Sequence, residues 1–269
     1  MKASDIRLAV PREDFVPDVI WVRRDDGWAV PLSRKDDPEE WNRLVAGDDQ
    51  PVITQVDDGA TDKGTWPTSS GSSPEIMAIM IDALDVRPGM RVLEIGTGTG
   101  YNAAVLAWLL GTPNVTTVEI DATVAEHARD ALRAAGYPVR VVTADGLKGH
   151  PENAPYDRII VTAAVTHVPY AWVEQTKPGG MILAPWAPTF HPDWPLCRLT
   201  VQADATAEGR FIGPSSFMPM RGQRFPQSVM HEAEEEWTRL GEPAFGRFGV
   251  TVTPTGQQIW LDSKENVIK

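Results

Sequence analysis

The chain has 269 residues, of which 25 are Lys or Arg and 37 are Asp or Glu, so its formal net charge at pH 7 is −12. This charge argues against a nucleic-acid-binding protein, because phosphate backbones are attracted by clustered basic surface and no basic run exceeds Arg23-Arg24 or Arg34-Lys35. With 42% hydrophobic and 23% charged residues, the composition is that of a globular protein with a substantial core.

The single cysteine and the absence of long apolar runs predict the subcellular location of the protein. Cys197 is the single cysteine and has no partner for an internal disulfide, and no Cys or His spacing resembles a metal site. The first 15 residues carry scattered charges where a signal peptide needs an apolar run, and no later window is apolar enough to span a bilayer. We therefore expect a cytoplasmic protein with no bound metal and no membrane association, and the sequence leaves its oligomeric state open.

Three segments of different character follow one another along the chain. Residues 1–70 are rich in Asp, Pro, Gly and Trp with only short apolar runs, and they predict an irregular N-terminal cap on the substrate side. Residues 71–205 predict a ligand-binding core. Residues 206–269 predict a C-terminal α+β extension, with a helix over 225–240 and two strands around the turn Pro254-Thr255-Gly256.

The core segment alternates between strands and helices. Apolar residues recur at helical spacing from Pro74 until Arg87-Pro88-Gly89 ends the helix. The strands that the hydrophobic runs then predict are residues 91–95, 115–120, 139–145, 158–164 and 180–186, and the helices between the first three are residues 101–110 and 122–136. This alternation is typical of parallel α/β units, so the predicted fold is a doubly wound, Rossmann-like sheet.

The most informative motif is a glycine-rich turn between a predicted strand and a predicted helix. Gly96, Gly98 and Gly100 let the backbone turn tightly and let a ligand approach without meeting a Cβ atom, and the helix that follows presents free N–H groups. A dinucleotide fingerprint requires a small residue where Tyr101 stands. The pattern therefore favours a ligand without phosphates and with a cationic amino-acid end, which describes S-adenosyl-L-methionine.

Three carboxylates lie at the predicted ends of successive strands, where open α/β sheets bind ligands. Glu94 suits the cationic end of the ligand, Glu119 the two ribose hydroxyls and Asp145 the adenine amino group. Each of them taken singly is more often a helix cap or a solvated strand end, and it is their combination that favours a cofactor site. The other residues expected to contact the cofactor are their neighbours Thr97, Tyr101, Asn102, Ile120 and Gly146.

Several motifs together resemble the protein-L-isoaspartate O-methyltransferase family. The resemblance extends from about Val10 to about Trp186, and it is carried by VPREDFVP (10–17), SSPEIMA (72–78), RVLEIGTGTGYNAA (91–104), YDRIIVTAA (156–164) and QTKPGGMILAP (175–185). It implies an S-adenosyl-L-methionine-dependent enzyme that releases S-adenosyl-L-homocysteine and esterifies an aspartyl or isoaspartyl carboxylate of a peptide or protein. The ester then closes to a succinimide.

By the same resemblance Ser72 lies on the family's active-site serine. We take Ser72 and Ser73 as catalytic candidates, and Thr54, Gln55 and Ser72 as substrate contacts. The alternative is that Ser72 or Ser73 caps the helix that starts at Pro74, with Ser72 and Glu75 spaced as a capping box.

The sequence departs from the family pattern in two ways. Glu75 stands where the family has histidine, and the chain is longer than the family core at both ends. Such enlarged relatives resemble the methyltransferases that modify precursor peptides in bacterial ribosomal-peptide pathways, where the aspartimide is the product. Two other functions stay open: methylation of a small metabolite, and a cofactor-binding or peptide-binding module without catalysis. An NAD-dependent enzyme ranks last because of Tyr101.

Overall fold

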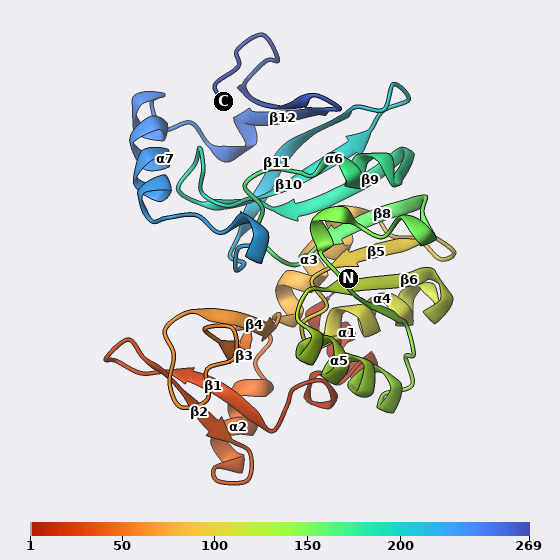
Figure 1. Ribbon diagram of the computed structural model, residues 1–269, viewed down its shortest axis with the longest axis vertical. Coiled ribbons are helices and arrows are strands. Elements are labelled where there is room, and N and C mark those ends of the chain that lie inside the picture. Colours follow the sequence, from red (N-terminus) through yellow and green to blue (C-terminus); the bar gives the residue numbers. More distant parts are fainter. Residues whose placement is uncertain (1) are drawn as a thin grey trace. The chain divides into compact units, whose positions relative to one another are not determined.

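The computed structural model describes residues 2–269, which form two compact units (Figure 1). The first unit contains the residues up to Gly89 together with Thr97–Ala144, and the second contains Met90–Gly96 together with Asp145–Lys269. The predicted division at residues 70 and 205 follows sequence character and stays a prediction. Within residues 2–269, no helix combines the length and the apolar composition that crossing a membrane requires.

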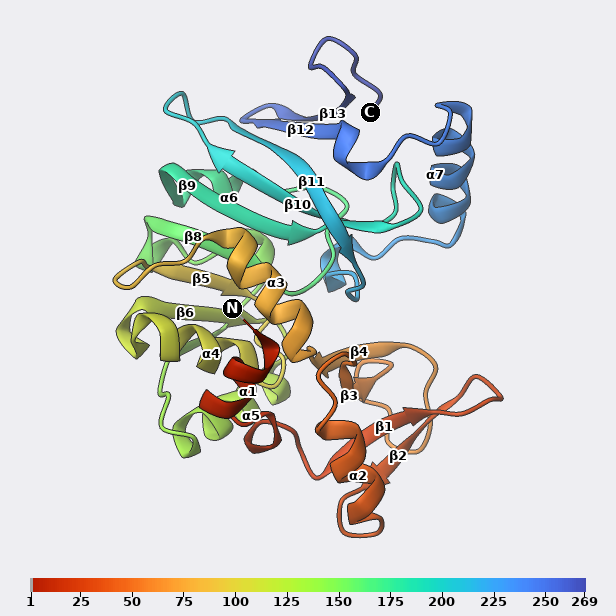
Figure 2. The same cartoon turned by 180° about the vertical axis from the view of Figure 1, so that it is seen from behind.

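The N-terminal segment is ordered, and the prediction of an irregular cap is wrong. Helix α1 (Ala3–Ala9) and a short 3-10 helix (Arg12–Asp14) precede an antiparallel sheet with the strand order β2-β1-β3-β4. Its strands are β1 (Val19–Arg23), β2 (Ala29–Ser33), β3 (Val52–Val56) and β4 (Pro67–Gly71), and helix α2 (Pro38–Val45) lies between β2 and β3 in the chain (Figure 2).

Both faces of this small sheet are covered by apolar side chains. Alternate residues of a strand point to opposite faces, so Ile20 and Trp21 belong to different clusters. Ile20 packs with Trp41 of α2, and Trp21 packs with Val56. The strand pattern of this segment is weak, because β2 contains Pro31 and β4 has the polar sequence PTSSG.

The rest of the first unit consists of helices around a parallel strand pair. It contains α3 (Pro74–Leu84), α4 (Tyr101–Leu110), β6 (Val115–Glu119), α5 (Ala122–Ala134) and β7 (Arg140–Thr143). Strands β6 and β7 are parallel with α5 between them in the chain, as the alternating pattern predicts. Helix α4 is buried over Tyr101–Ala107, whereas α5 is amphipathic and buries Ala125, Ala128 and Leu132.

The second unit carries parallel strands that continue into antiparallel ones. Its strand order is β13-β12-β11-β10-β9-β8-β5. Strands β5 (Val92–Ile95), β8 (Tyr156–Val161) and β9 (Thr176–Pro185) are parallel, and β10 (Trp194–Val201), β11 (Ala207–Ser215), β12 (Phe248–Thr253) and β13 (Gly256–Leu261) are antiparallel. Strands β12 and β13 confirm the two strands predicted around the turn Pro254-Thr255-Gly256.

Two helices complete the second unit. Helix α6 (Tyr170–Glu174) precedes β9, and α7 (Ser228–Arg239) lies in the C-terminal extension (Figure 1). Helix α7 confirms the helix predicted there, but its apolar stripe is only partly buried, because Ala233 is buried whereas Met230 is 37% exposed.

Candidate active site

The glycine-rich turn joins β5 to α4 and uses backbone conformations that L-residues with a side chain rarely adopt. Gly96 has φ +97° and Gly98 has φ +53°. In the second unit, a Cβ atom on Gly96 would lie 2.7 Å from Oγ1 of Thr162. Glycine at position 96 is therefore required by packing as well as by backbone conformation.

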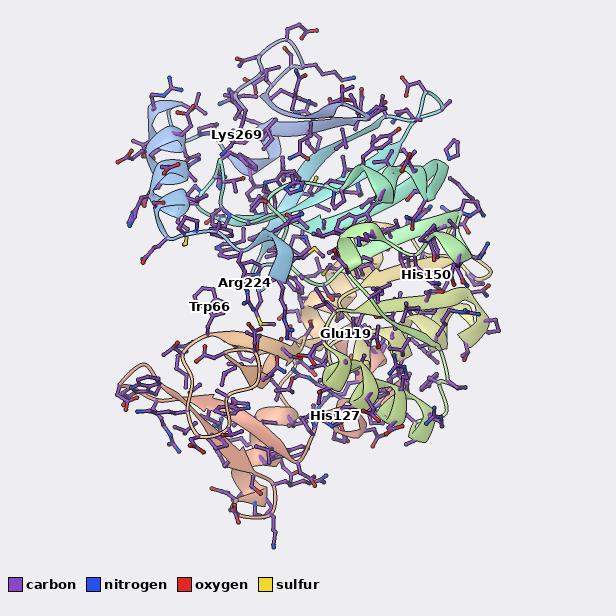
Figure 3. The ribbon with its side chains drawn as sticks, viewed as in Figure 1. Trp66, Glu119, His127, His150, Arg224 and Lys269 are labelled. Carbon is purple, nitrogen blue, oxygen red and sulfur yellow. The ribbon has the colours of Figure 1, made fainter. Side chains whose placement is uncertain are left out.

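In the first unit, the turn is held by hydrogen bonds to strand β6. The Gly98 N–H donates to Oε2 of Glu119 at 3.0 Å, and Oε1 of Glu119 accepts from the Asp121 N–H at 3.1 Å. The hydroxyls of Thr97 and Thr117 form a buried hydrogen bond of 2.7 Å. Figure 3 shows Glu119 near the start of α5.

The negative charge of Glu119 beside the turn indicates which class of ligand the turn can accept. A phosphate needs free backbone N–H groups and no nearby negative charge. Here the Gly98 N–H is already paired with a carboxylate, so the turn is unsuited to a pyrophosphate. A ribose offers hydroxyl donors to a carboxylate, and the arrangement therefore fits a nucleoside without phosphates, such as S-adenosyl-L-methionine.

The first residues of α4 support the turn from inside. Tyr101 is 1% exposed, and its ring packs against Phe15 with centroids 5.9 Å apart. Burial raises the pKa of the Tyr101 hydroxyl to about 12, so the group stays neutral. Asn102 is also buried, whereas the side chain of Ile120, next to Glu119, is 44% exposed and offers apolar surface at the end of β6.

The end of strand β4 lies against Gly98 and Thr99 of the glycine-rich turn, and all of these residues belong to the first unit. A Cβ atom on Gly98 would lie 3.0 Å from the carbonyl oxygen of Ser70. A Cβ atom on Gly71 would lie 3.5 Å from the Thr99 side chain. Two consecutive residues of β4 thus contact two consecutive residues of the turn, and the next residue in the chain is Ser72.

The two candidate serines have different environments. Ser73 is the N-cap of α3, since its Oγ accepts from the Ile76 N–H at 3.3 Å, and Pro74 follows it at the first helical position. Ser72 is half-buried, and within residues 2–269 its hydroxyl has no hydrogen-bond partner. The expected capping box of Ser72 with Glu75 does not form: the Glu75 N–H donates instead to the Asp48 carbonyl at 3.0 Å, and its side chain is exposed.

Four cofactor candidates lie in the second unit, Gly96 among them. Glu94 is fully buried in β5. Asp145 is half-buried and caps a short 3-10 helix, because its Oδ1 accepts from the Leu147 N–H at 3.0 Å. A Cβ atom on Gly146 would lie 2.6 Å from the Ile95 side chain, so this glycine is needed for packing.

A cleft of about 420 Å³ in the first unit brings together residues from five separate parts of the chain. Two of the three predicted substrate contacts line it: Oγ1 of Thr54 donates to Oγ of Ser69 at 3.1 Å, and Nε2 of Gln55 donates to Oδ2 of Asp121 at 3.2 Å. The third, Ser72, is not among the residues that line it. The residues that line it are Asp14, Phe15, Val16, Pro17, Asp18, Thr54, Gln55, Ser69, Gly98, Thr99, Thr123, Val124, His127 and Ala131.

Sequence reasoning missed most of this lining. Asp14 and Phe15 lie inside the VPREDFVP motif, and this motif is the sequence feature that could have indicated them as site residues. Ser69 and His127 lie in no motif that would distinguish them from other residues. In the described part of the chain, no three His, Cys, Asp or Glu side chains are grouped so that they could hold a metal ion.

Comparisons with known proteins identify the family. Residues 54–224 match the family model for Protein-L-isoaspartate(D-aspartate) O-methyltransferase (PCMT). A protein-L-isoaspartate O-methyltransferase of Hyperthermus butylicus is 34% identical over 226 residues, which is 80% of this chain and 79% of that relative. The enzyme of the same name from Ignicoccus hospitalis is 49% identical over 189 residues, covering 68% of this chain and 72% of the relative.

Solved structures support the same fold. A protein-L-isoaspartate O-methyltransferase structure superposes with a TM-score of 0.69 over 97% of this chain and 95% of the other, at 22% identity. A Plasmodium falciparum protein described as a putative member and solved with S-adenosyl-L-homocysteine gives a TM-score of 0.59 at 14% identity, over 81% of this chain and 89% of that one. The chain belongs to the protein-L-isoaspartate O-methyltransferase family of S-adenosyl-L-methionine-dependent enzymes.

Proposed function

We propose that this protein methylates the side-chain carboxylate of an aspartyl or isoaspartyl residue in a peptide or protein. The observation that carries the proposal is the contact between the end of β4 and the glycine-rich turn, at Ser70 with Gly98 and at Gly71 with Thr99. Ser72 is the next residue in the chain after Gly71, and its hydroxyl has no hydrogen-bond partner within residues 2–269. A small-metabolite acceptor or a non-catalytic module would not require this juxtaposition.

Different residues would contact different parts of the cofactor: its ribose, its base and its amino-acid end. The turn over Gly96, Thr97, Gly98 and Gly100 gives close backbone approach, with Tyr101 and Asn102 as its internal support. Glu119 would accept from the ribose hydroxyls, and the exposed side chain of Ile120 would pack against the base. We assign Asp145 and Gly146 to the base as well, and Glu94 to the cationic amino-acid end. When bound, the cofactor supplies a methyl group on a sulfonium.

The acceptor needs positioning more than acid or base catalysis. An aspartyl carboxylate has an ordinary pKa of about 4, so it is already ionised at neutral pH. We assign the hydroxyl of Ser72 to hydrogen-bond one carboxylate oxygen and so orient the other for in-line attack on the methyl group. Thr54 and Gln55 line the cleft beside Ser69 and would contact the peptide flanking the acceptor.

Esterification changes the later chemistry of the peptide. The ester carbonyl has no negative charge and can expel its methoxy group, whereas a carboxylate would have to lose oxide. The following backbone nitrogen can therefore attack the ester carbonyl, lose its proton and close a succinimide with release of methanol. Repair of isoaspartate and deliberate formation of an aspartimide share these steps. They differ in which peptide the enzyme accepts and in whether the imide is then hydrolysed, as in repair, or kept as the product.

The test uses the full chain with labelled S-adenosyl-L-methionine and three acceptors. The acceptors are a peptide with aspartate, the same peptide with isoaspartate at that position, and a precursor peptide encoded beside the gene, if there is one. We expect base-labile methyl ester on the isoaspartyl or the precursor peptide, and slower formation of it in Ser72→Ala. If none of the three gains a base-labile methyl group while S-adenosyl-L-homocysteine binds, the proposal fails.

A further inference from the structure

A buried arginine near the N-terminus has no role in the function proposed so far. Arg12 is fully buried, and its guanidinium donates to the carbonyl oxygens of Gly47 at 2.9 Å, Gln50 at 3.0 Å and Gly71 at 2.7 Å. Burying a charge is costly unless it is well hydrogen-bonded, and bonds from a charged donor are stronger than neutral ones. The three bonds therefore connect Arg12 firmly to two other parts of the first unit.

These bonds fix the backbone on both sides of Ser72. The Gly71 carbonyl, which Arg12 binds directly, belongs to the residue immediately before Ser72. On the other side, the Glu75 N–H donates to the Asp48 carbonyl at 3.0 Å. Asp48 lies between Gly47 and Gln50, whose carbonyls are the other two acceptors of Arg12.

The same region contacts the glycine-rich turn. A Cβ atom on Gly71 would be 3.5 Å from the Thr99 side chain and 3.9 Å from Nε of Arg12, so Gly71 lies between the two. Phe15, one helical turn after Arg12, packs on Tyr101, the first residue of α4. The guanidinium thus lies where the serine turn and the glycine-rich turn meet.

We propose that Arg12 is a positioning residue for methyl transfer: it holds the backbone around Ser72 at a fixed place against the glycine-rich turn. The inference rests on the proposed function, in which Ser72 orients the acceptor carboxylate. Arginine suits the task because its planar group has five fixed donors, whereas a lysine ammonium is a compact point charge that does not reach three separate carbonyls in this way. Burial lowers the pKa of Arg12 to about 10, which leaves it protonated at neutral pH.

The test compares Arg12→Lys with a matched arginine, Arg7 of helix α1, which contacts the same loop around Asp48. Arg7 approaches Asp48 Oδ1 through Nε at 3.1 Å and donates to the Ala46 carbonyl, but it is solvent-accessible and does not contact Gly71. We expect Arg12→Lys to lower kcat roughly 10- to 100-fold, because small misplacements of reacting groups cost that much. The affinity for S-adenosyl-L-homocysteine should stay within about threefold, and Arg7→Met should change neither.

A double-mutant cycle separates positioning from general stability. If Arg12 acts through Ser72, Arg12→Lys should lower kcat by a clearly smaller factor in a Ser72→Ala background than in the wild type, because both substitutions remove the same positioning of the acceptor. Rates are divided by the number of sites that bind S-adenosyl-L-homocysteine, so that partial unfolding does not count as lost catalysis. Equal losses in both backgrounds, or an unchanged kcat, overturn the inference.

Should Arg12→Lys not fold, Gly71→Val tests the same link without removing the buried charge. Its Cβ atom would already be in van der Waals contact with Thr99 and Arg12, so the two further methyl groups must displace one of these neighbours. We expect a lower kcat with little change in cofactor affinity, and an unchanged kcat would again overturn the inference. Failure of the proposed function looks different, since the unaltered chain would then esterify none of the peptides.

Discussion

Ser72 and Ser73 are adjacent, but their hydroxyls have different tasks. The Ser73 hydroxyl caps α3, whereas that of Ser72 has no partner within residues 2–269. Ser73→Ala should therefore cost about 1 kcal/mol of stability, the usual loss for an N-cap, and lower Tm by roughly 2 to 4 °C. Ser72→Ala should leave Tm unchanged and lower kcat. Thermal unfolding followed by circular dichroism, combined with steady-state kinetics, distinguishes the two, and the reverse pattern would exchange their roles.

Gly98 combines a left-handed backbone with a close neighbour. In Gly98→Ala the new methyl group would lie 3.0 Å from the Ser70 carbonyl, at φ +53°. The turn must then move, and we expect the affinity for S-adenosyl-L-homocysteine to fall at least about tenfold, since even 1.4 kcal/mol of strain is a factor of ten.

Gly27 provides the control for this prediction. It has φ +88° in the turn between β1 and β2, and no atom lies within 4 Å of its Cβ position. Gly27→Ala therefore has the backbone strain without the contact, and should lower stability modestly while leaving cofactor affinity intact. Calorimetric titration of both variants measures this, and equal affinities for Gly98→Ala and wild type would refute the role of the turn.

At the scale of elements, helix α7 is tied to the second unit by an aromatic cluster around a buried histidine. The His191 ring lies 5.2 Å from the ring of Trp237 in α7 and 5.8 Å from that of Phe248 in β12. His191 is 2% exposed, its Nδ1 accepts from the Asp193 N–H at 3.2 Å, and Nε2 has no hydrogen-bond partner within residues 2–269. Burial lowers the pKa of His191, although the nearby Asp193 carboxylate acts in the opposite direction.

This cluster should make stability depend on pH. Because the folded pKa of His191 lies below its ordinary value near 6.5, the unfolded chain takes up the proton first as the pH falls. Stability is therefore complete above about pH 6.5 and declines as the pH passes below it. Between pH 7.5 and 5, the Tm of His191→Phe should fall less than the Tm of the wild type. In the control His231→Gln, which changes an exposed residue of α7, the Tm should fall as much as in the wild type.

The elements that the sequence predicts well are those with long apolar runs. Strand β5 and helix α4 are almost wholly buried, so their hydrophobic pattern is continuous. Strand β4 could not be predicted in this way, because PTSSG is stabilised by pairing with β3 and not by apolar side chains of its own. Short helices such as α6, with five residues, have too few turns to show a period.

At the scale of the whole molecule, the site could be predicted only where its residues are contiguous. The glycine-rich turn is a single motif, and its neighbours in the sequence are also its neighbours in space. Arg12 contacts Gly71 across 59 positions of sequence, and nothing near Arg12 in the chain indicates that contact. The substrate cleft is built from similarly distant segments, so only the fold reveals it.

The net charge of −12 should influence which peptides reach the site. Asp14 and Asp18 are exposed at the cleft, and none of the residues that line it is Lys or Arg. An isoaspartyl peptide flanked by lysines should therefore have a kcat/KM roughly tenfold higher than the same peptide flanked by glutamates at about 20 mM salt, because long-range attraction raises the encounter rate. At about 500 mM salt the Debye length is only ~4 Å, and the ratio should approach one. A ratio that does not change with salt would mean that direct contacts in the cleft, and not the overall field, select the peptide.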